Sequence, residues 1–340
     1  MPRSDRLSVF EWELLAEKLD RAVAEAARLY FQRLTSRHIR IDPKTWSDEL
    51  DELRLQREPD YDRPGLPLVY ALKYMPRRVI SIFGSLLRVL GDRYPTSVLD
   101  VGSGTGATAL ALDLLNAPRH INLLGIEPSR EMIAFAECSQ YRARVSARYN
   151  EGSVASGSLS HLPLESFDLV VFSACFPYRF DRWDPLLATL GDFEDNEGTM
   201  ILAVEPDGKA DLLHSFARGL RARGWPTQTF CCHDLPEPIK RDDIPLKDMQ
   251  EVWKRIGSPG SKPPKTWWNP PDDKFLIANP LPPWPSAGVR RVVHRDKLLG
   301  ARVLARCAPT SLRAQAEAIQ SEGLTAGEAR VHLKQVLGTA

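Results

Sequence analysis

Strand-like and helix-like segments alternate through the middle of the chain, and this alternation limits the possible folds more than any other feature. Runs rich in apolar and β-branched residues predict strands at 97–101, 121–127, 143–149, 167–173 and 198–205. Helical periodicity fills the first two intervals, and Ser129 is placed to cap the second of these helices. Strands that alternate with helices form parallel sheets covered on both faces. We therefore expect an α/β fold, with further strands at 227–232 and 274–278.

Helical and charged segments precede this region. Residues 9–35 carry apolar side chains three and four apart, which predicts an amphipathic helix lying on the protein's own core or on another subunit. The latter alternative would make the N-terminal helix an oligomer contact. The acid-rich stretch 42–63 indicates a solvated connector, and a second helix over 68–91 leads into the alternating region.

A basic segment follows the alternating region. Residues 289–307 predict a hairpin that holds six basic residues and one acidic residue, and the tail from 310 predicts two short helices. The chain is thus expected to have three parts: an N-terminal helical extension (1–65), a central α/β domain (66–280) and a small C-terminal hairpin-plus-helix extension (281–340).

A glycine-rich turn, with Asp100 close before it, follows the first predicted strand in "VLDVGSGTGATALAL" (98–112). Its residues are Gly102, Ser103, Gly104 and Gly106. Such a turn often holds a dinucleotide, whose pyrophosphate sits at the helix N-terminus, and Gly102-x-Gly104-x-x-Ala107 can be fitted to that fingerprint. The carboxylate of Asp100 would repel a pyrophosphate, whereas it would favour S-adenosylmethionine, which carries an ammonium and a sulfonium and no phosphate.

A second acid ends the next predicted strand in "LLGIEPS", where the carboxylate of Glu127 can accept hydrogen bonds from both ribose hydroxyls. Asp100, the three glycines and Glu127 together resemble the class I S-adenosylmethionine-dependent methyltransferases over residues 66–280. The resemblance implies a seven-stranded, mostly parallel sheet with helices on both faces and an antiparallel last strand. It also implies that the cofactor lies across the carboxyl ends of strands one to four.

The remaining cofactor contacts are expected from segments around this motif. Many relatives carry an acid after the third strand that binds the adenine amino group, and the aligned stretch here offers Ser158, so Ser158 or backbone groups take that place. Arg77 or Arg78, on the helix before the motif, can bind the methionine carboxylate of the cofactor. A solvated helix face is the alternative for both arginines.

A fainter resemblance covers more of the chain. The segments "YALKYMP", "LAVEPDGKADLLHSFARGL", "FCCH" and "DDKFLIA" look like the methyltransferase-like proteins of small-ribosomal-subunit assembly in mitochondria and their bacterial relatives. That family generally holds an iron–sulfur cluster on four cysteines, a set that this sequence lacks. The similarity supports the architecture more than the ribosomal role.

Candidate residues for the chemistry follow strands four and five, at the sheet edge where ligands bind. Tyr178 lies in "SACFPYRFDRW", which stands where many amino-group methyltransferases have Asn-Pro-Pro-Tyr. Its side chain either lines the acceptor pocket or is a loop aromatic that only packs against its neighbours. Glu205 can orient or deprotonate an acceptor, or instead cap a neighbouring turn. Asp168 begins strand four, away from the methyl group, and is expected to be structural.

The net charge of the chain limits the classes of molecule that it is expected to bind. The net charge of +1 gives the molecule no overall attraction to nucleic acid or membrane. A small molecule, amino acid or peptide is therefore the expected acceptor of a methyl group on nitrogen or oxygen. The alternative is a non-catalytic or RNA-directed ribosome assembly factor that contacts RNA through the basic residues of 289–306.

The N-terminal segment, the apolar runs and the cysteines indicate the cellular compartment and whether a metal site is expected. We expect a cytoplasmic protein, because neither a secretory signal nor a membrane-spanning run is evident. Five irregularly spaced cysteines favour reduced thiols. The "CCH" at 231–233 lacks a second ligand pair, so no metal site is expected.

Overall fold

The computed structural model describes residues 9–40, 42, 45, 48, 50, 59–90, 93–139, 141, 144–153, 159, 162, 164–176, 183–206, 209–231, 247–257 and 274–279. Ser158, Tyr178 and the predicted hairpin and helices of 281–340 lie outside the described residues, so the expectations that concern them stay predictions.

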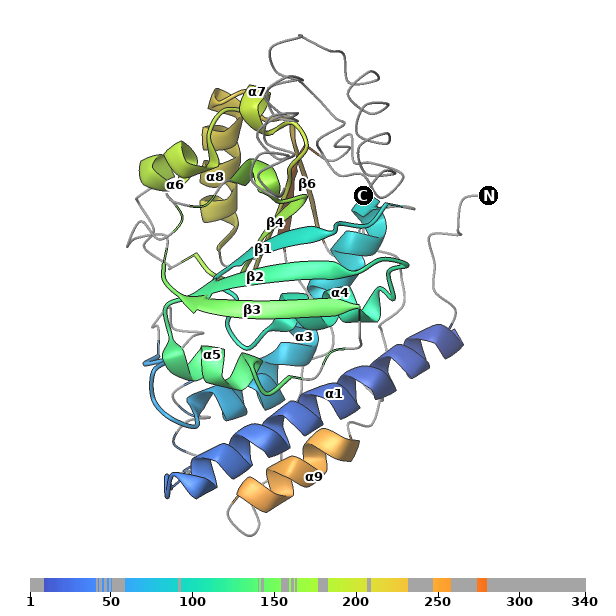
Figure 1. Ribbon diagram of the computed structural model, residues 1–340, viewed down its shortest axis with the longest axis vertical. Helices are drawn as coiled ribbons and strands as arrows, with labels where there is room; N and C mark the ends of the chain where they lie inside the picture. Colours follow the sequence, from blue (N-terminus) through green and yellow to red (C-terminus); the bar gives the residue numbers. More distant parts are fainter. Residues whose placement is uncertain are drawn as a thin grey trace, which may run out of the picture.

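Within the described residues, seven strands form one sheet in the order β3-β2-β1-β4-β5-β7-β6 (Figure 1). The strands are β1 (Ser97–Val101), β2 (Ile121–Glu127), β3 (Val145–Glu151), β4 (Leu169–Ser173), β5 (Met200–Glu205), β6 (Thr227–Cys231) and β7 (Lys274–Ala278). The first five strands pair in parallel, and β7 runs antiparallel between β5 and β6. The predicted seven-stranded, mostly parallel sheet with an antiparallel last strand is confirmed.

Helices cover both faces of this sheet. They are α1 (Val9–Ser36), α3 (Leu66–Leu90), α4 (Ala107–Leu114), α5 (Arg130–Ala136), α6 (Trp183–Leu190), α7 (Phe193–Asn196), α8 (Ala210–Ala222) and α9 (Lys247–Ile256). Successive side chains of a strand point to opposite faces. Val98 accordingly packs in a cluster with α3 and α4, whereas Leu99 packs in a second cluster with α6 and α8. Asp100 points to the same face as Val98, toward α4.

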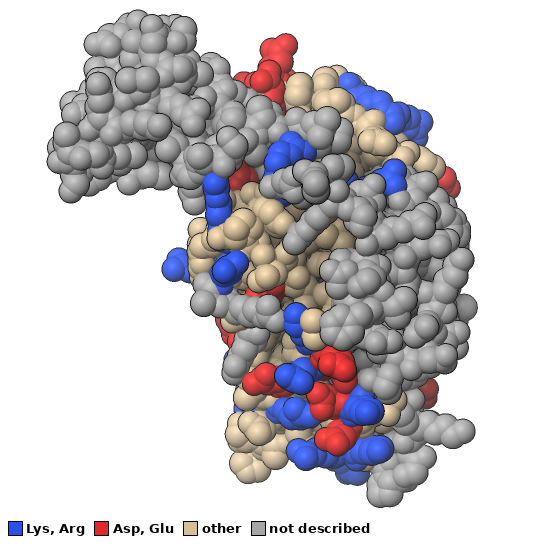
Figure 2. All heavy atoms as spheres, turned by 90° about the vertical axis from the view of Figure 1, so that its right-hand side faces the viewer, with Lys and Arg blue, Asp and Glu red and all other residues tan. Residues whose placement is uncertain are grey.

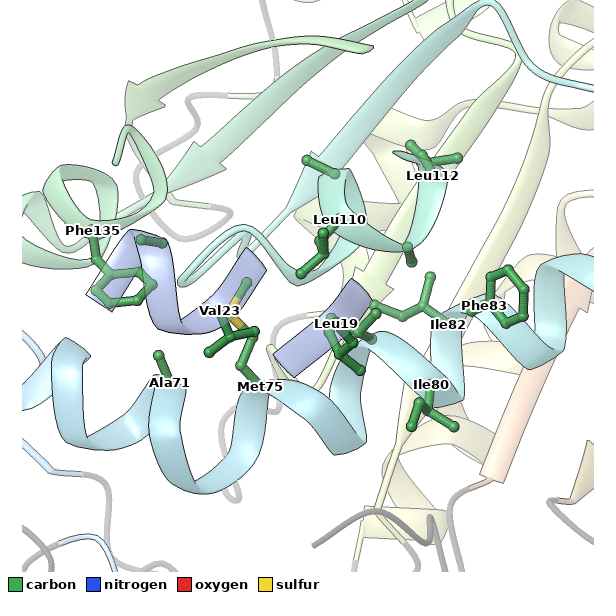
Figure 3. Close-up of a cluster of buried hydrophobic side chains, with 14 of the residues drawn as sticks. Leu19, Val23, Ala71, Met75, Ile80, Ile82, Phe83, Leu110, Leu112 and Phe135 are labelled. Carbon is green, nitrogen blue, oxygen red and sulfur yellow. The ribbon is translucent and has the colours of Figure 1, made fainter. Parts of the chain in front are cut away.

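Helix α1 packs against α3, on the protein's own core. Leu19 and Val23 of α1 are fully buried beside Met75 of α3 (Figure 3), and their cluster continues to Phe135 of α5. The helix therefore shares the apolar cluster of the α/β domain, and the domain division expected at residue 65 stays a prediction.

Two polar contacts fix α1 to segments far away in the sequence. The hydroxyl of Tyr30 donates to Glu131 on α5 (2.5 Å) and accepts from the backbone N–H of Gly65 at the start of α3 (3.4 Å). The buried carboxylate of Asp20 accepts from the N–H groups of Asp248 and Met249 (3.0 and 2.9 Å), and so caps the N-terminus of α9. Helix α9, which comes between β6 and β7 in the sequence, is thereby attached to α1.

Charges of both signs intermix on the surface of this helical layer. Figure 2 shows basic and acidic side chains interspersed on the lower part of one face. Between α1 and α9, Arg28 lies 3.8 Å from Asp248. Exposed pairs of this kind contribute little to stability. No helix among the described residues is long and apolar enough to cross a membrane.

Replacing Leu19 with alanine should lower the free energy of unfolding by roughly 2–5 kcal/mol, because the change leaves a cavity between α1 and α3. Urea unfolding measures this loss. Leu14→Ala is the matched control, since Leu14 is on the same helix and 41% exposed, and its effect should stay within about 0.5 kcal/mol. Equal losses for the two variants would contradict the packing of α1 on the core.

Candidate functional site: a glycine turn between two buried carboxylates

The glycine-rich turn joins β1 to α4 at the carboxyl edge of the sheet. Gly102, Gly104 and Gly106 have φ angles of 70°, 51° and 85°, in the left-handed region that glycine adopts without steric cost. The N–H groups of Gly102 and Ser103 both donate to the carbonyl of Ile126 (2.7 and 3.2 Å), which ties the turn to the end of β2. The predicted motif therefore forms a compact backbone loop next to the strand that carries Glu127.

Asp100 lies beneath this turn and is 1% exposed. Its Oδ1 accepts a hydrogen bond from the hydroxyl of Thr108 on α4 (2.8 Å), whereas Oδ2, also buried, has no hydrogen-bond partner among the described residues. Burial raises the pKa of Asp100 to about 7; the Thr108 hydrogen bond opposes this shift, and the charge of Glu127 adds to it. A buried carboxylate oxygen without a donor is compatible with a cationic ligand group, and the cofactor-binding role of Asp100 stays a prediction.

Glu127 ends β2 on the other side of the turn and is also buried. Its Oε2 accepts from the N–H of Gly104 (2.8 Å), and its Oε1 accepts from the N–H of Ser129 (3.0 Å). Burial raises the pKa of Glu127, these two bonds lower it, and Asp62 adds to the rise. Each carboxylate oxygen accepts a second hydrogen bond readily, so the fixed carboxylate still suits a pair of ribose hydroxyls. Ser129 caps α5 through Met132 N (3.1 Å), as predicted.

Sequence reasoning missed the tyrosine pair beneath the turn. Gly125 of β2 is in register with both Asp100 and Tyr149, so the side chains of these two residues share one face of the sheet. A Cβ at Gly125 would lie 2.4 Å from the ring of Tyr149, which occupies that space. The hydroxyls of Tyr149 and Tyr141 are hydrogen-bonded to each other (2.9 Å) and lie beside Gly106. A glycine in the middle of a strand was the available signal, because it marks a close approach.

The end of the acid-rich stretch is not merely a solvated connector. The carbonyl of Tyr61 accepts a hydrogen bond from the Ser129 hydroxyl (2.9 Å), and Asp62 Oδ1 accepts from the N–H of Arg130 (3.0 Å). These contacts lay residues 59–65 against the turn that follows Glu127. Asp60, Asp62 and Arg63 are exposed, as expected for a solvated connector, and the contacts at this end are an addition that the sequence did not predict. A charge count does not show which carboxylates meet a helix N-terminus.

The two arginines stay candidates for a cofactor carboxylate. Arg77 and Arg78 are half-buried on α3, the helix that packs beside α4. The expectation that one of them binds the methionine carboxylate of the cofactor stays a prediction. Among the described residues, no group of three or more His, Cys, Asp or Glu side chains is placed to hold a metal ion.

The turn after β4 faces the glycine turn. Ala174 has a φ of 52°, which is uncommon for a residue with a side chain, and a Cβ at Gly102 would lie only 2.3 Å from Cβ of Cys175. Burial raises the pKa of the Cys175 thiol well above its ordinary value, and Glu205 adds to this shift. Cys175 thus forms a wall directly beside the first glycine, a contact that no local sequence pattern announced.

Glu205 lies behind this wall. It is completely buried at the end of β5, and its Oε1 accepts from the N–H of Phe176 (3.1 Å). Asp168 lies at the opposite edge, where its Oδ2 accepts from the N–H groups of Thr96 and Ser97 (2.7 and 3.0 Å). The structural role predicted for Asp168 is confirmed, whereas the catalytic role predicted for Glu205 stays a prediction that its burial does not favour.

The family follows from this geometry together with a match in sequence. Residues 98–193, which run from β1 to the start of α7, match the family described as "Methyltransferase domain". The chain contains a class I, S-adenosylmethionine-dependent methyltransferase domain. Its strand order, its antiparallel β7 and its paired acids at Asp100 and Glu127 agree with that assignment.

A curated protein with a similar sequence is also named as a methyltransferase. Over 151 residues the chain is 32% identical to a "Release factor glutamine methyltransferase" of Pasteurella multocida (strain Pm70), covering 43% of this chain and 45% of that protein. The match thus covers less than half the length of this curated relative.

Two solved structures are also similar to the chain. The plantazolicin methyltransferase BpumL, in complex with a triazolic desmethylPZN analog and SAH, has 16% identity and a TM-score of 0.38, with 77% of this chain and 98% of that chain covered. The methyltransferase domain of bacterial-CtHen1-C has 13% identity and a TM-score of 0.36, with 60% and 96% covered.

The raised pKa of Asp100 predicts a pH-dependent stability in the absence of ligand. With a pKa of about 7 in the folded state against 3.8 unfolded, Asp100 lowers the stability progressively as the pH rises through this window, and the loss is complete above it. Asp100→Asn mimics the neutral form. The free energy of unfolding of this variant minus that of the wild type should therefore be larger at pH 8 than at pH 5.5 by roughly 2 kcal/mol. Urea unfolding at both pH values measures this gain, and a difference that does not change with pH would contradict it.

Proposed function

We propose that the chain is a methyltransferase that transfers the methyl group of S-adenosylmethionine to a nitrogen or oxygen nucleophile of a small molecule, amino acid or peptide. The observation that carries the proposal is the buried Oδ2 of Asp100 beneath the glycine turn, which accepts no hydrogen bond from the part of the chain that the structure describes. A pyrophosphate there would be repelled, whereas an ammonium group supplies the missing donor and favours the ionised carboxylate. The family match over 98–193 supports the same cofactor.

Each part of the site has a separate task in this reaction. S-adenosylmethionine supplies a methyl carbon bonded to a sulfonium, and the sulfur leaves as a neutral thioether. Asp100 binds the ammonium group, Glu127 accepts the ribose hydroxyls, and the glycines let the backbone approach the ligand. The acceptor's lone pair must lie in line with the carbon–sulfur bond, so the protein acts mainly by alignment and by excluding water.

Among the described residues, the edge of the sheet beside Gly102 presents the Cys175 turn and no open carboxylate base, since Glu205 is buried behind it. An acceptor that arrives with a free lone pair suits such a site, and its proton leaves to solvent after transfer. The partial similarity to a glutamine methyltransferase that acts on release factors supports a peptide or protein nitrogen as one acceptor.

The RNA-directed alternative rests on a different part of the chain. Its support is the excess of basic residues in 289–306, which lies outside the described residues. Structured RNA should then bind to the chain, and this binding should weaken steeply with salt and vanish when the basic side chains of 289–306 are neutralised. Such a result would favour the RNA-directed alternative over a small methyl acceptor.

Glu127→Ala tests the cofactor site directly. Each hydrogen bond from a ribose hydroxyl to this charged group contributes on the order of 1.5–3 kcal/mol, so the affinity for S-adenosylhomocysteine should fall at least about tenfold. Calorimetry with the intact chain measures the change. Glu137→Ala removes a carboxylate that pairs with Arg33 on the surface (3.6 Å), and it should bind as the wild type does.

Two results would overturn the proposal. One is tight binding of NAD with no response to S-adenosylhomocysteine. The other is an unchanged affinity in a folded Glu127→Ala protein, which would remove Glu127 from the site.

A further inference from the structure

We propose that Glu205 and Lys209 act as a positioning pair that holds the turn after β4 against the glycine turn. The inference builds on the proposed function, because that turn is the wall of the site beside Gly102. It gives Glu205 a role different from general-base catalysis, and it adds Lys209, which the sequence did not single out.

The pair binds both backbone groups of one residue. The N–H of Phe176 donates to Glu205 Oε1 (3.1 Å), and the carbonyl of Phe176 accepts from Lys209 Nζ. Lys209 Nζ also lies 3.9 Å from Glu205 Oε2, and the two side chains are 6% and 0% exposed. Because both partners are shielded from water, these contacts have little competition from solvent.

The side chain of Phe176 is held as firmly as its backbone. Its ring stacks on Phe172 of β4 (5.5 Å between centroids) and meets Trp183 of α6 and Phe216 of α8 edge to face (5.0 and 5.3 Å). Aromatic pairs at these separations add to the stabilisation from burial. Phe176 is thus fixed from β4, β5, α6 and α8 together.

A fixed Phe176 determines where Cys175 lies. Between β4 and Phe176 there are only two residues, Ala174 and Cys175, and Ala174 has a left-handed φ of 52°. A residue with a side chain persists in this conformation only where its surroundings impose it. The constraint on Phe176 therefore keeps Cβ of Cys175 against Gly102, where an added Cβ would overlap it.

The energetics favour positioning over stabilisation as the reason for a buried pair. Removing two charges from water costs about as much free energy as their attraction returns, so an apolar pair would hold the fold equally well. An apolar pair, however, cannot bind both the N–H and the carbonyl of Phe176. The pair therefore serves the geometry of this turn.

The test uses the full chain and measures the reactivity of Cys175 without any knowledge of the acceptor. In the double variant Glu205→Gln/Lys209→Met, the glutamine keeps an acceptor for Phe176 N–H while both charges are removed, so no unpaired charge stays buried. Alkylation by iodoacetamide is followed at each cysteine by peptide mass spectrometry. Cys138, half-buried at the end of α5, is the internal reference. Asp192→Asn/Arg223→Met, which removes a more exposed ion pair (3.2 Å), is the matched control variant.

We expect Cys175 to react at least about tenfold faster in the Glu205→Gln/Lys209→Met protein, with the rate at Cys138 unchanged. An unchanged rate at Cys175 in the folded variant would overturn the proposal. An equal rise at Cys175 and Cys138 would also overturn it, because global unfolding exposes both thiols and the pair would then be only structural. S-adenosylhomocysteine should slow alkylation of Cys175 in the wild type; if it does not bind, the proposed function fails while the comparison of rates still decides the role of the pair.

Discussion

The burial of Asp100 on the central strand is the constraint on which the site depends. β1 lies between β2 and β4, and Asp100 is in register with Gly125 on one side and Val171 on the other. A carboxylate in this position costs free energy, which the packing of helices on both faces of the sheet must offset. The surrounding residues follow from it: Thr108 supplies one hydrogen bond, and Gly125 leaves room for Tyr149 on the face that Asp100 shares.

The two sides of the proposed cofactor site are stabilised by different means. Backbone N–H groups and residues 59–65 hold Glu127 and the turn after it, so the ribose side is attached to the N-terminal part of the chain. A buried ion pair and a group of aromatic rings hold the turn beside Gly102. A reaction that proceeds by alignment needs both walls at fixed positions, and these supports lie outside the first layer of residues around the ligand.

The N-terminal helix connects these supports to the rest of the molecule. Tyr30 joins α1 to α5 and to the start of α3, and Asp20 caps α9 more than two hundred residues later. Because α1, α3 and α9 share one apolar cluster, loss of α1 should loosen the turn after Glu127 as well as the helical layer. The helix that begins the described chain is therefore part of the framework of the site.

The sequence by itself determined the α/β class, the central strands, the glycine turn between Asp100 and Glu127, and the Ser129 cap. These features depend on residues close together in the chain, whose spacing repeats the geometry of a strand, a turn or a helix. Only the tertiary structure decided that α1 packs on the protein's own core, that Asp62 meets the turn after Glu127, that Cys175 lies against Gly102, and that Glu205 is buried with Lys209. The partners in these contacts come from separate elements. Which carboxylate is buried and which is exposed depends on how all the layers pack, and no local pattern of charge or hydropathy contains that information.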